Sequence, residues 1–146
     1  MGLDMYLKGK RFLWHNEEQL KQAIRLALPD APGVPTEVTV EAAYWRKANH
    51  IHKWFVDNVQ EGEDDCKDYY VSREQLTTLH DLCQYILEHP EEAKGKLPTE
   101  SGFFFGGTEY DEDYFNDLRN TMKQLKPIIE SDNSFKDWDF EYRASW

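Results

Sequence analysis

The chain has few cysteines, few basic residues and no long apolar run. Its two cysteines, Cys66 and Cys83, show no metal-binding or redox spacing, which is typical of a reduced, cytoplasmic protein. No apolar run approaches the roughly 18 residues that a membrane-spanning helix needs. The first residues also lack the charged start and the long apolar stretch of a signal peptide. We therefore expect a cytoplasmic protein with no membrane partner.

Basic residues are outnumbered in this chain: 17 Lys and Arg stand against 28 Asp and Glu, and the formal net charge is −11. A protein that binds nucleic acid usually carries a basic stripe, so direct binding of nucleic acid is not expected. Aromatic residues make up 14% of the sequence, which argues against a disordered acidic tail. At roughly 150 residues per domain, the length predicts one domain over residues 1–146.

Apolar residues that recur three or four positions apart predict about four helices. We place them at 16–28, 42–59, 72–89 and 111–131. Pro29 and Pro90 end the first and the third, and Pro127 should kink or end the last. Ser72 and Gln75 have the spacing of a reciprocal capping pair at the start of the third helix.

Alternating apolar and polar residues predict the strands. The clearest alternation covers 138–142, and shorter strands are expected at 36–40, 69–71 and 103–105, the last of them buried. Residues 2–14 should form a small hairpin that turns at Gly9. Together these elements predict an α+β fold, with about four helices packed on a small, mainly antiparallel sheet.

The segment from Tyr44 to Phe55 carries the first candidate site. On the predicted helix, Trp45, Asn49 and His52 share one stripe, and Arg46 lies on an adjacent one. An aromatic ring, an amide, an imidazole and cations on one flank suit an anionic, planar ligand such as a nucleotide. The alternative is a partly buried amphipathic helix whose Trp and His pack at the margin of the core.

Two histidines and one aspartate are candidates for metal binding or acid–base catalysis. His50 and His52 are two residues apart, so a helix points them to different sides, and no metal or other cofactor is expected. Asp4 lies in an apolar segment and needs a partner, such as Arg46 or His52. An Asp–His pair serves acid–base catalysis or simply structure, and no motif marks a nucleophile.

A glycine-rich stretch, Ser101 to Asp111, is the third candidate. Glycines ahead of a helix let backbone N–H groups face an anion, but the spacing is neither a P-loop nor a dinucleotide fingerprint. The acidic residues at 109–113 would repel a nearby phosphate, and they favour the start of the next helix through its dipole.

Several stretches resemble a family of small proteins from bacteriophages and prophages. They are the start MGLDMYL, the segment YWRKAN with IHKWF, the segment SGFFFG with Tyr110 and Asp111, and the aromatic end at Trp146. The resemblance covers most of the chain except residues 8–36, and it implies a phage product in the cytoplasm of a host bacterium. The resemblance implies no particular activity. With the stripe above, its motifs contain the polar and aromatic residues that we expect to converge on one ligand site: Asp4, Trp45, Arg46, Lys47, Asn49, His52, Tyr110 and Asp111.

Three functions fit this context. The first is a ligand-binding protein that sequesters a nucleotide signal of host defence. The second is an acidic inhibitor that binds a host protein by imitating DNA charge, with dense acid at 61–68 and 109–113. The third is a small hydrolase that uses Asp4 and His52. A homo-oligomer is expected for the first two, with strand 138–142 either pairing at a sheet edge or covering its own core.

Overall fold

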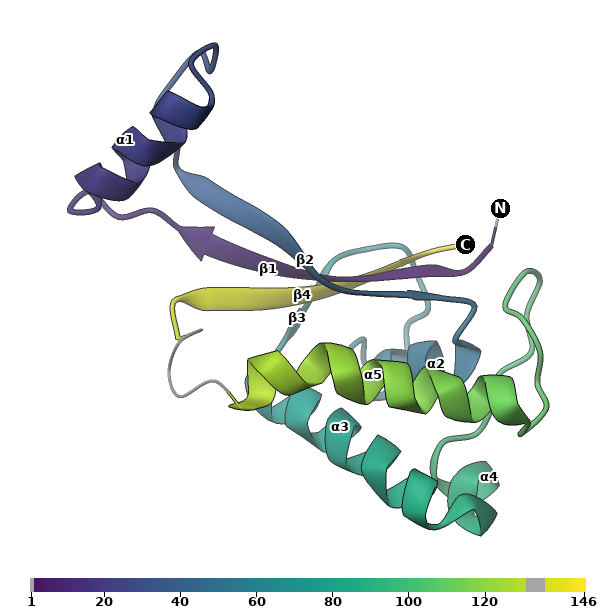
Figure 1. Cartoon of the computed structure of the whole chain (residues 1–146). Helices are drawn as coiled ribbons and strands as arrows, with labels where there is room; N and C mark the ends of the chain where they lie inside the picture. Colours follow the sequence, from purple (N-terminus) through teal and green to yellow (C-terminus); the bar gives the residue numbers. More distant parts are fainter. Residues whose placement is uncertain (1, 131–135) are drawn as a thin grey trace.

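A computed structural model describes residues 2–130 and 136–146 of the chain. Within these residues it contains one four-stranded antiparallel sheet, in the order β2-β1-β4-β3. The strands are β1 (Asp4–Phe12), β2 (Glu37–Arg46), β3 (Tyr69–Val71) and β4 (Trp138–Ser145). The helices are α1 (Glu18–Ala27), α2 (Asn49–Asn58), α3 (Arg73–Glu88), α4 (Ala93–Lys96) and α5 (Glu112–Glu130), with a 3₁₀ turn at Pro90–Glu92. The predicted α+β fold is confirmed (Figure 1).

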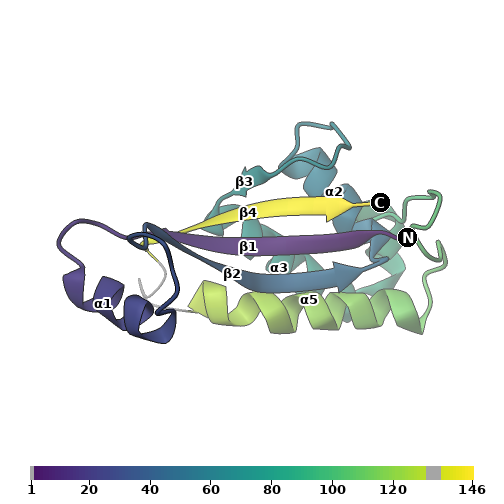
Figure 2. The ribbon, with the colours of Figure 1, turned by 90° about the horizontal axis from the view of Figure 1, so that it is seen from above.

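The sheet has one covered face. Helices α2, α3 and α5 lie beneath it, and the opposite face carries no helix (Figures 1 and 2). The alternation along β1 fits this arrangement, because Met5 and Leu7 are fully buried while Tyr6 and Lys8 are partly exposed. The ring of Phe55 from α2 stacks on Tyr142 of β4 at 3.8 Å between centroids. Burial of these apolar side chains supplies most of the free energy that holds the helices to the sheet.

The start of α3 has the cap that the sequence predicts. The Ser72 side chain accepts a hydrogen bond from the Gln75 amide, and the Gln75 side chain accepts one from the Ser72 amide. This is the predicted capping pair, which satisfies two backbone N–H groups that the helix leaves free. Helix α5 covers nearly the predicted range and continues through Pro127 to Glu130, so the proline does not end it.

The predicted helix at 42–59 is wrong in its first half. Residues up to Arg46 belong to β2, and the helix α2 begins only at Asn49. Ala43 and Trp45 are buried while Tyr44 and Arg46 face outwards, which is the period of a strand. Apolar residues at short spacing fit both the period of a strand and the period of a helix. Pairing with β1 selects the strand here.

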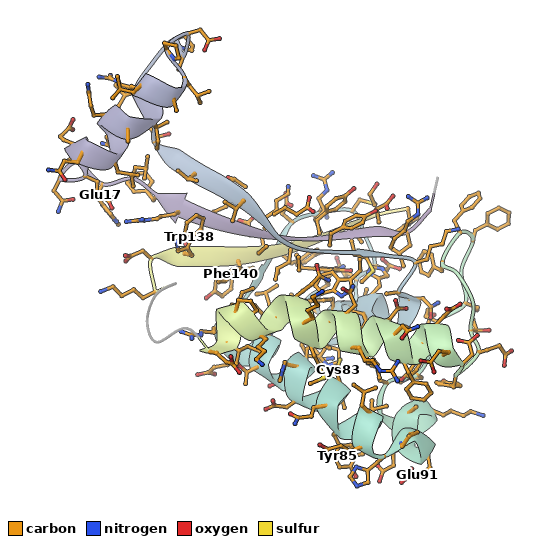
Figure 3. The ribbon with its side chains drawn as sticks, viewed as in Figure 1. Glu17, Cys83, Tyr85, Glu91, Trp138 and Phe140 are labelled. Carbon is orange, nitrogen blue, oxygen red and sulfur yellow. The ribbon has the colours of Figure 1, made fainter. Side chains whose placement is uncertain are left out.

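The predicted hairpin turn at Gly9 is also wrong. Gly9 lies inside β1, paired with Val40 on one side and Phe140 on the other. A Cβ atom at this position would lie 3.2–3.4 Å from the side chains of Val40, Trp138 and Phe140. Trp138 and Phe140 lie on β4 close to the place where the β1–β2 hairpin leaves the body (Figure 3). The glycine therefore makes room for large side chains.

Two further strand predictions need correction. Residues 103–105 form no strand: they lie in a turn, with Phe103 85% exposed and only Phe105 buried. For the strand at 138–142, the sequence allows either pairing at a sheet edge or covering its own core, and the structure shows the second. β4 lies between β1 and β3, so it covers its own core.

Helix α1 stands apart from the body. It lies at the end of the β1–β2 hairpin, clear of the sheet and of the other helices (Figures 1 and 2). Leu20 and Ile24 are half-buried, whereas Leu28, just past the end of the helix, is exposed. We call residues 13–36 the arm. Within the described residues, no helix is both long and apolar enough to cross a membrane.

Candidate functional site

A pocket of about 350 Å³ lies where β2 ends and where α2 and α5 begin. The loop at 106–111 forms its remaining wall. The lining carries charges of both signs around a buried inner end. The cations are Arg46 and Lys47, the carboxylates are Glu109, Asp111, Asp113 and Asp117, and the inner end is the buried set Asn49, His50 and Tyr114.

The backbone around the pocket is strained. Lys47, between β2 and α2, has a φ of +56°, a conformation that costs free energy for any residue with a Cβ atom. Its amide donates a hydrogen bond of 2.7 Å to the Leu3 carbonyl. Gly106 has a φ of +92°, and a Cβ atom there would lie 2.9 Å from the Lys47 carbonyl oxygen. The chain therefore changes direction at Lys47 and packs the glycine loop against it.

Asn49 holds the loop over the pocket. Its side chain is buried, and Nδ2 donates to the carbonyl groups of Phe105 at 3.1 Å and Gly107 at 2.8 Å. Its Oδ1 accepts from the Glu100 amide at 2.9 Å. Asn49 was expected to offer its amide to a ligand, but both ends of the amide already bond to the loop backbone. Its function here is to order the loop.

His50 is the most unusual polar residue of the site. It is 2% exposed, and its ring packs against that of Tyr114, with 4.3 Å between centroids and a tilt of 31° between the ring planes. Burial lowers the pKa of His50 to about 4, although a hydrogen bond to the Tyr114 backbone opposes the shift. The ring is therefore neutral at pH 7. Its Nε2 atom has no hydrogen-bond partner among the described residues.

Asp117 faces this imidazole from α5. Its Oδ2 lies 3.7 Å from His50 Nε2, too far for a hydrogen bond. Burial raises the pKa of Asp117 to about 6, and the charges of Asp113 and Asp111 add to the shift. At pH 7 a carboxylate thus faces a neutral ring, so the pair is not an ion pair there.

The two side chains of this pair are not satisfied by the described residues. His50 Nε2 is buried without a hydrogen-bond partner there, and it lies 3.7 Å from Asp117 Oδ2. The Tyr114 amide donates to Asp111 Oδ1 and not to this pair. A carboxylate only accepts, so a hydrogen-bond donor suits the Asp117 side of the pair.

Four of the predicted site residues line the pocket: Arg46, Lys47, Asn49 and Asp111. Asp4 lies beside it, because its Oδ1 is 3.4 Å from Arg46 Nη1 and accepts a hydrogen bond from the Tyr44 hydroxyl. Arg46 is thus the partner that Asp4 finds. The side chain of Arg46 remains 55% exposed and accessible to a ligand. Tyr110 packs on Tyr114 at 5.0 Å between centroids and accepts from the Thr99 amide, so it supports the inner end.

Trp45 and His52 do not belong to the pocket. Trp45 points into the core, where its Nε1 donates to Thr121 Oγ1 at 2.9 Å. His52 is held between the Tyr142 hydroxyl at 2.7 Å and Asp64 Oδ1 at 2.8 Å. The predicted stripe of Trp45, Asn49 and His52 is wrong because the helix begins after Trp45. Among the described contacts, none joins His52 to Asp4.

Sequence reasoning missed His50, Tyr114 and Asp117. His50 was considered only as a metal ligand, and Tyr114 and Asp117 are one helical turn apart on α5. That spacing was visible, but nothing in the sequence placed α5 beside the start of α2. Within the described residues, no group of three or more His, Cys, Asp or Glu side chains is arranged to hold a metal ion.

The acidic loop at 61–68 is largely paired within the molecule. Asp64 bonds to His52 and to Trp146 Nε1, and Asp65 accepts from Tyr69. Asp68 lies 3.7 Å from Lys8 Nζ and 3.8 Å from an Arg143 nitrogen. These carboxylates stabilise the loop against the sheet and leave less free charge for a partner.

Comparison with known proteins adds no assignment. No protein-family model, no curated protein and no solved structure matches the chain.

Proposed function

We propose that the chain is a ligand-binding protein that takes a nucleotide into the pocket between β2, α2 and α5. The observation that carries the proposal is the mixed charge of the pocket lining. Arg46 and Lys47 supply positive charge, and the Asp117 carboxylate lies 3.7 Å from the buried, unpartnered Nε2 of His50. A ligand with an anionic end and a hydrogen-bond-donating end matches this lining.

The two cations suit a phosphate group. A guanidinium offers paired N–H donors to phosphate oxygens, and a lysine adds a compact positive charge. The carboxylates of Glu109, Asp111 and Asp113 repel phosphate, so they restrict it to the vicinity of Arg46 and Lys47. The volume of about 350 Å³ lies within the roughly 300–1,000 Å³ of small-molecule sites.

The resemblance to small phage proteins supplies a context for this binding. A phage protein that binds a nucleotide tightly lowers the free concentration of that nucleotide in the infected cell. We therefore propose sequestration of a nucleotide signal of host defence. The hydrolase hypothesis gains no support, because Asp4 and His52 have different partners. The DNA-imitation hypothesis is weakened because the 61–68 loop is paired internally.

The test is thermal unfolding of the purified protein with cyclic and linear nucleotides. A ligand at about 100 times its Kd stabilises the folded state by roughly 2.7 kcal/mol. For a domain of this size, that raises Tm by about 5–10 °C. Arg46→Ala removes the phosphate contact, so we expect the shift to be lost.

Arg143→Ala is the matched control. Arg143 is a surface arginine of similar exposure, 45%, with one carboxylate partner at 3.8 Å, but it lies away from the pocket on β4. This variant should keep the full shift. If no nucleotide raises Tm, or if both arginine variants lose the shift equally, nucleotide binding in this pocket is refuted.

A further inference from the structure

We infer that the inner end of the pocket recognises an N–H donor of the ligand, the exocyclic amino group of a nucleobase, through His50 and Asp117. This inference rests on the proposed nucleotide binding and names the class of base: adenine or cytosine, which carry an amino group, and not hypoxanthine or uracil, which carry a carbonyl oxygen at the same place.

The first step is the unsatisfied pair of side chains. His50 Nε2 is buried with no hydrogen-bond partner among the described residues, and it lies 3.7 Å from Asp117 Oδ2, an atom that only accepts when the carboxyl is ionised. An unpaired polar atom that is buried costs free energy, which a hydrogen-bonding group from outside the chain recovers. That group must be small, because the two atoms are close.

The second step is the charge around this point. The charges of Asp113 on α5 and of Asp111 just before it act on the Asp117 carboxylate, and the Tyr114 ring packs against the imidazole. Arg46 and Lys47 carry the opposite charge in the same lining. The field at the inner end is therefore negative, which favours the positive end of an N–H dipole and disfavours a carbonyl oxygen.

The third step is access. His50 Nε2 is closed off from solvent, whereas the Asp117 side chain is 33% exposed. An amino group that enters the pocket therefore contacts the Asp117 carboxylate, with His50 Nε2 behind it at 3.7 Å. A carboxylate accepts a hydrogen bond from an N–H group and repels a carbonyl oxygen.

The experiment compares matched nucleotides by calorimetry at pH 7. Adenosine 5′-monophosphate and inosine 5′-monophosphate differ in the 6-amino and 6-oxo groups, and cytidine and uridine monophosphates give a second pair. A hydrogen bond to a charged group predicts that the amino member binds about tenfold to a hundredfold more tightly. Asp117→Ala should reduce the ratio to near one.

Asp139→Ala is the matched control, because it removes the same charge from an exposed position on β4 that does not line the pocket. It should preserve the preference for the amino member. Equal binding of both members refutes this inference and leaves nucleotide binding standing. A preference that survives Asp117→Ala also refutes it. If no nucleotide binds, the proposed function fails and the inference with it.

Discussion

As pH falls, the contributions of His50 and Asp117 to the stability of the fold change in opposite directions. The pKa of His50 is lowered from 6.5 to about 4, so between these values the unfolded chain takes up a proton that the folded chain refuses. Stability from His50 is therefore lost as pH falls through this window. The pKa of Asp117 is raised from 3.8 to about 6, so the folded chain takes up that proton first. Stability from Asp117 rises as pH falls below 6, and the two effects offset each other.

Asp117→Asn should expose the contribution of His50. Without the acid that offsets it, stability is expected to fall more steeply than in the wild type between pH 6.5 and 4. The shift of His50 corresponds to about 3 kcal/mol as an upper bound. Urea unfolding at successive pH values measures the difference from wild type. Asp139→Asn, on β4 away from the pocket, serves as the control and should follow the wild-type curve. Parallel curves for Asp117→Asn and wild type would contradict the assignment.

A substitution of Trp45 tests whether this residue acts in the core or in ligand binding. Trp45→Phe removes the hydrogen bond from Nε1 to Thr121 Oγ1 inside the core. We expect the free energy of unfolding to drop by about 1–3 kcal/mol, the cost of an unsatisfied buried polar atom. Nucleotide affinity should stay unchanged, because the ring does not line the pocket. Trp14→Phe, at an exposed position, should change stability little. A large loss of nucleotide affinity in Trp45→Phe would instead show that the Trp45 ring takes part in ligand binding.

At the scale of elements, the arm is a long insertion between two strands that already pair. Phe12 faces Glu37 across the hairpin, and the Leu13 amide donates to the Thr36 carbonyl. Helix α1 is held at its start by Glu17, which accepts from Arg11 and from the Trp14 amide. The contacts that stabilise the arm are therefore mostly its own.

Replacing residues 14–35 by Asn-Gly should leave the body intact. A two-residue turn closes an antiparallel pair, and the shorter loop lowers the entropy cost of closure. We expect cooperative unfolding, a change in stability of less than about 2 kcal/mol, and the same nucleotide affinity as the full chain. Circular dichroism during thermal unfolding and calorimetry measure these quantities. Loss of cooperative unfolding would show that the arm is needed for the sheet.

At the scale of the whole molecule, the sequence predicts local features better than tertiary ones. The α3 cap and the alternation of β4 could be read because neighbouring residues decide them. The ambiguous run at 42–46 could not, since partners on β1 determine its conformation. The site was predicted in part for the same reason. Arg46, Lys47 and Asn49 are contiguous, whereas Asp117 comes to His50 only through the packing of α5.

The buried amide of Asn49 has a kinetic consequence. Its three hydrogen bonds fix the backbone at Glu100, Phe105 and Gly107 before any ligand arrives. Ordering a backbone residue costs about 1–2 kcal/mol, and the ligand is spared this cost. Association then needs no slow rearrangement of the loop, so the observed binding rate should rise linearly with nucleotide concentration rather than level off at a conformational limit.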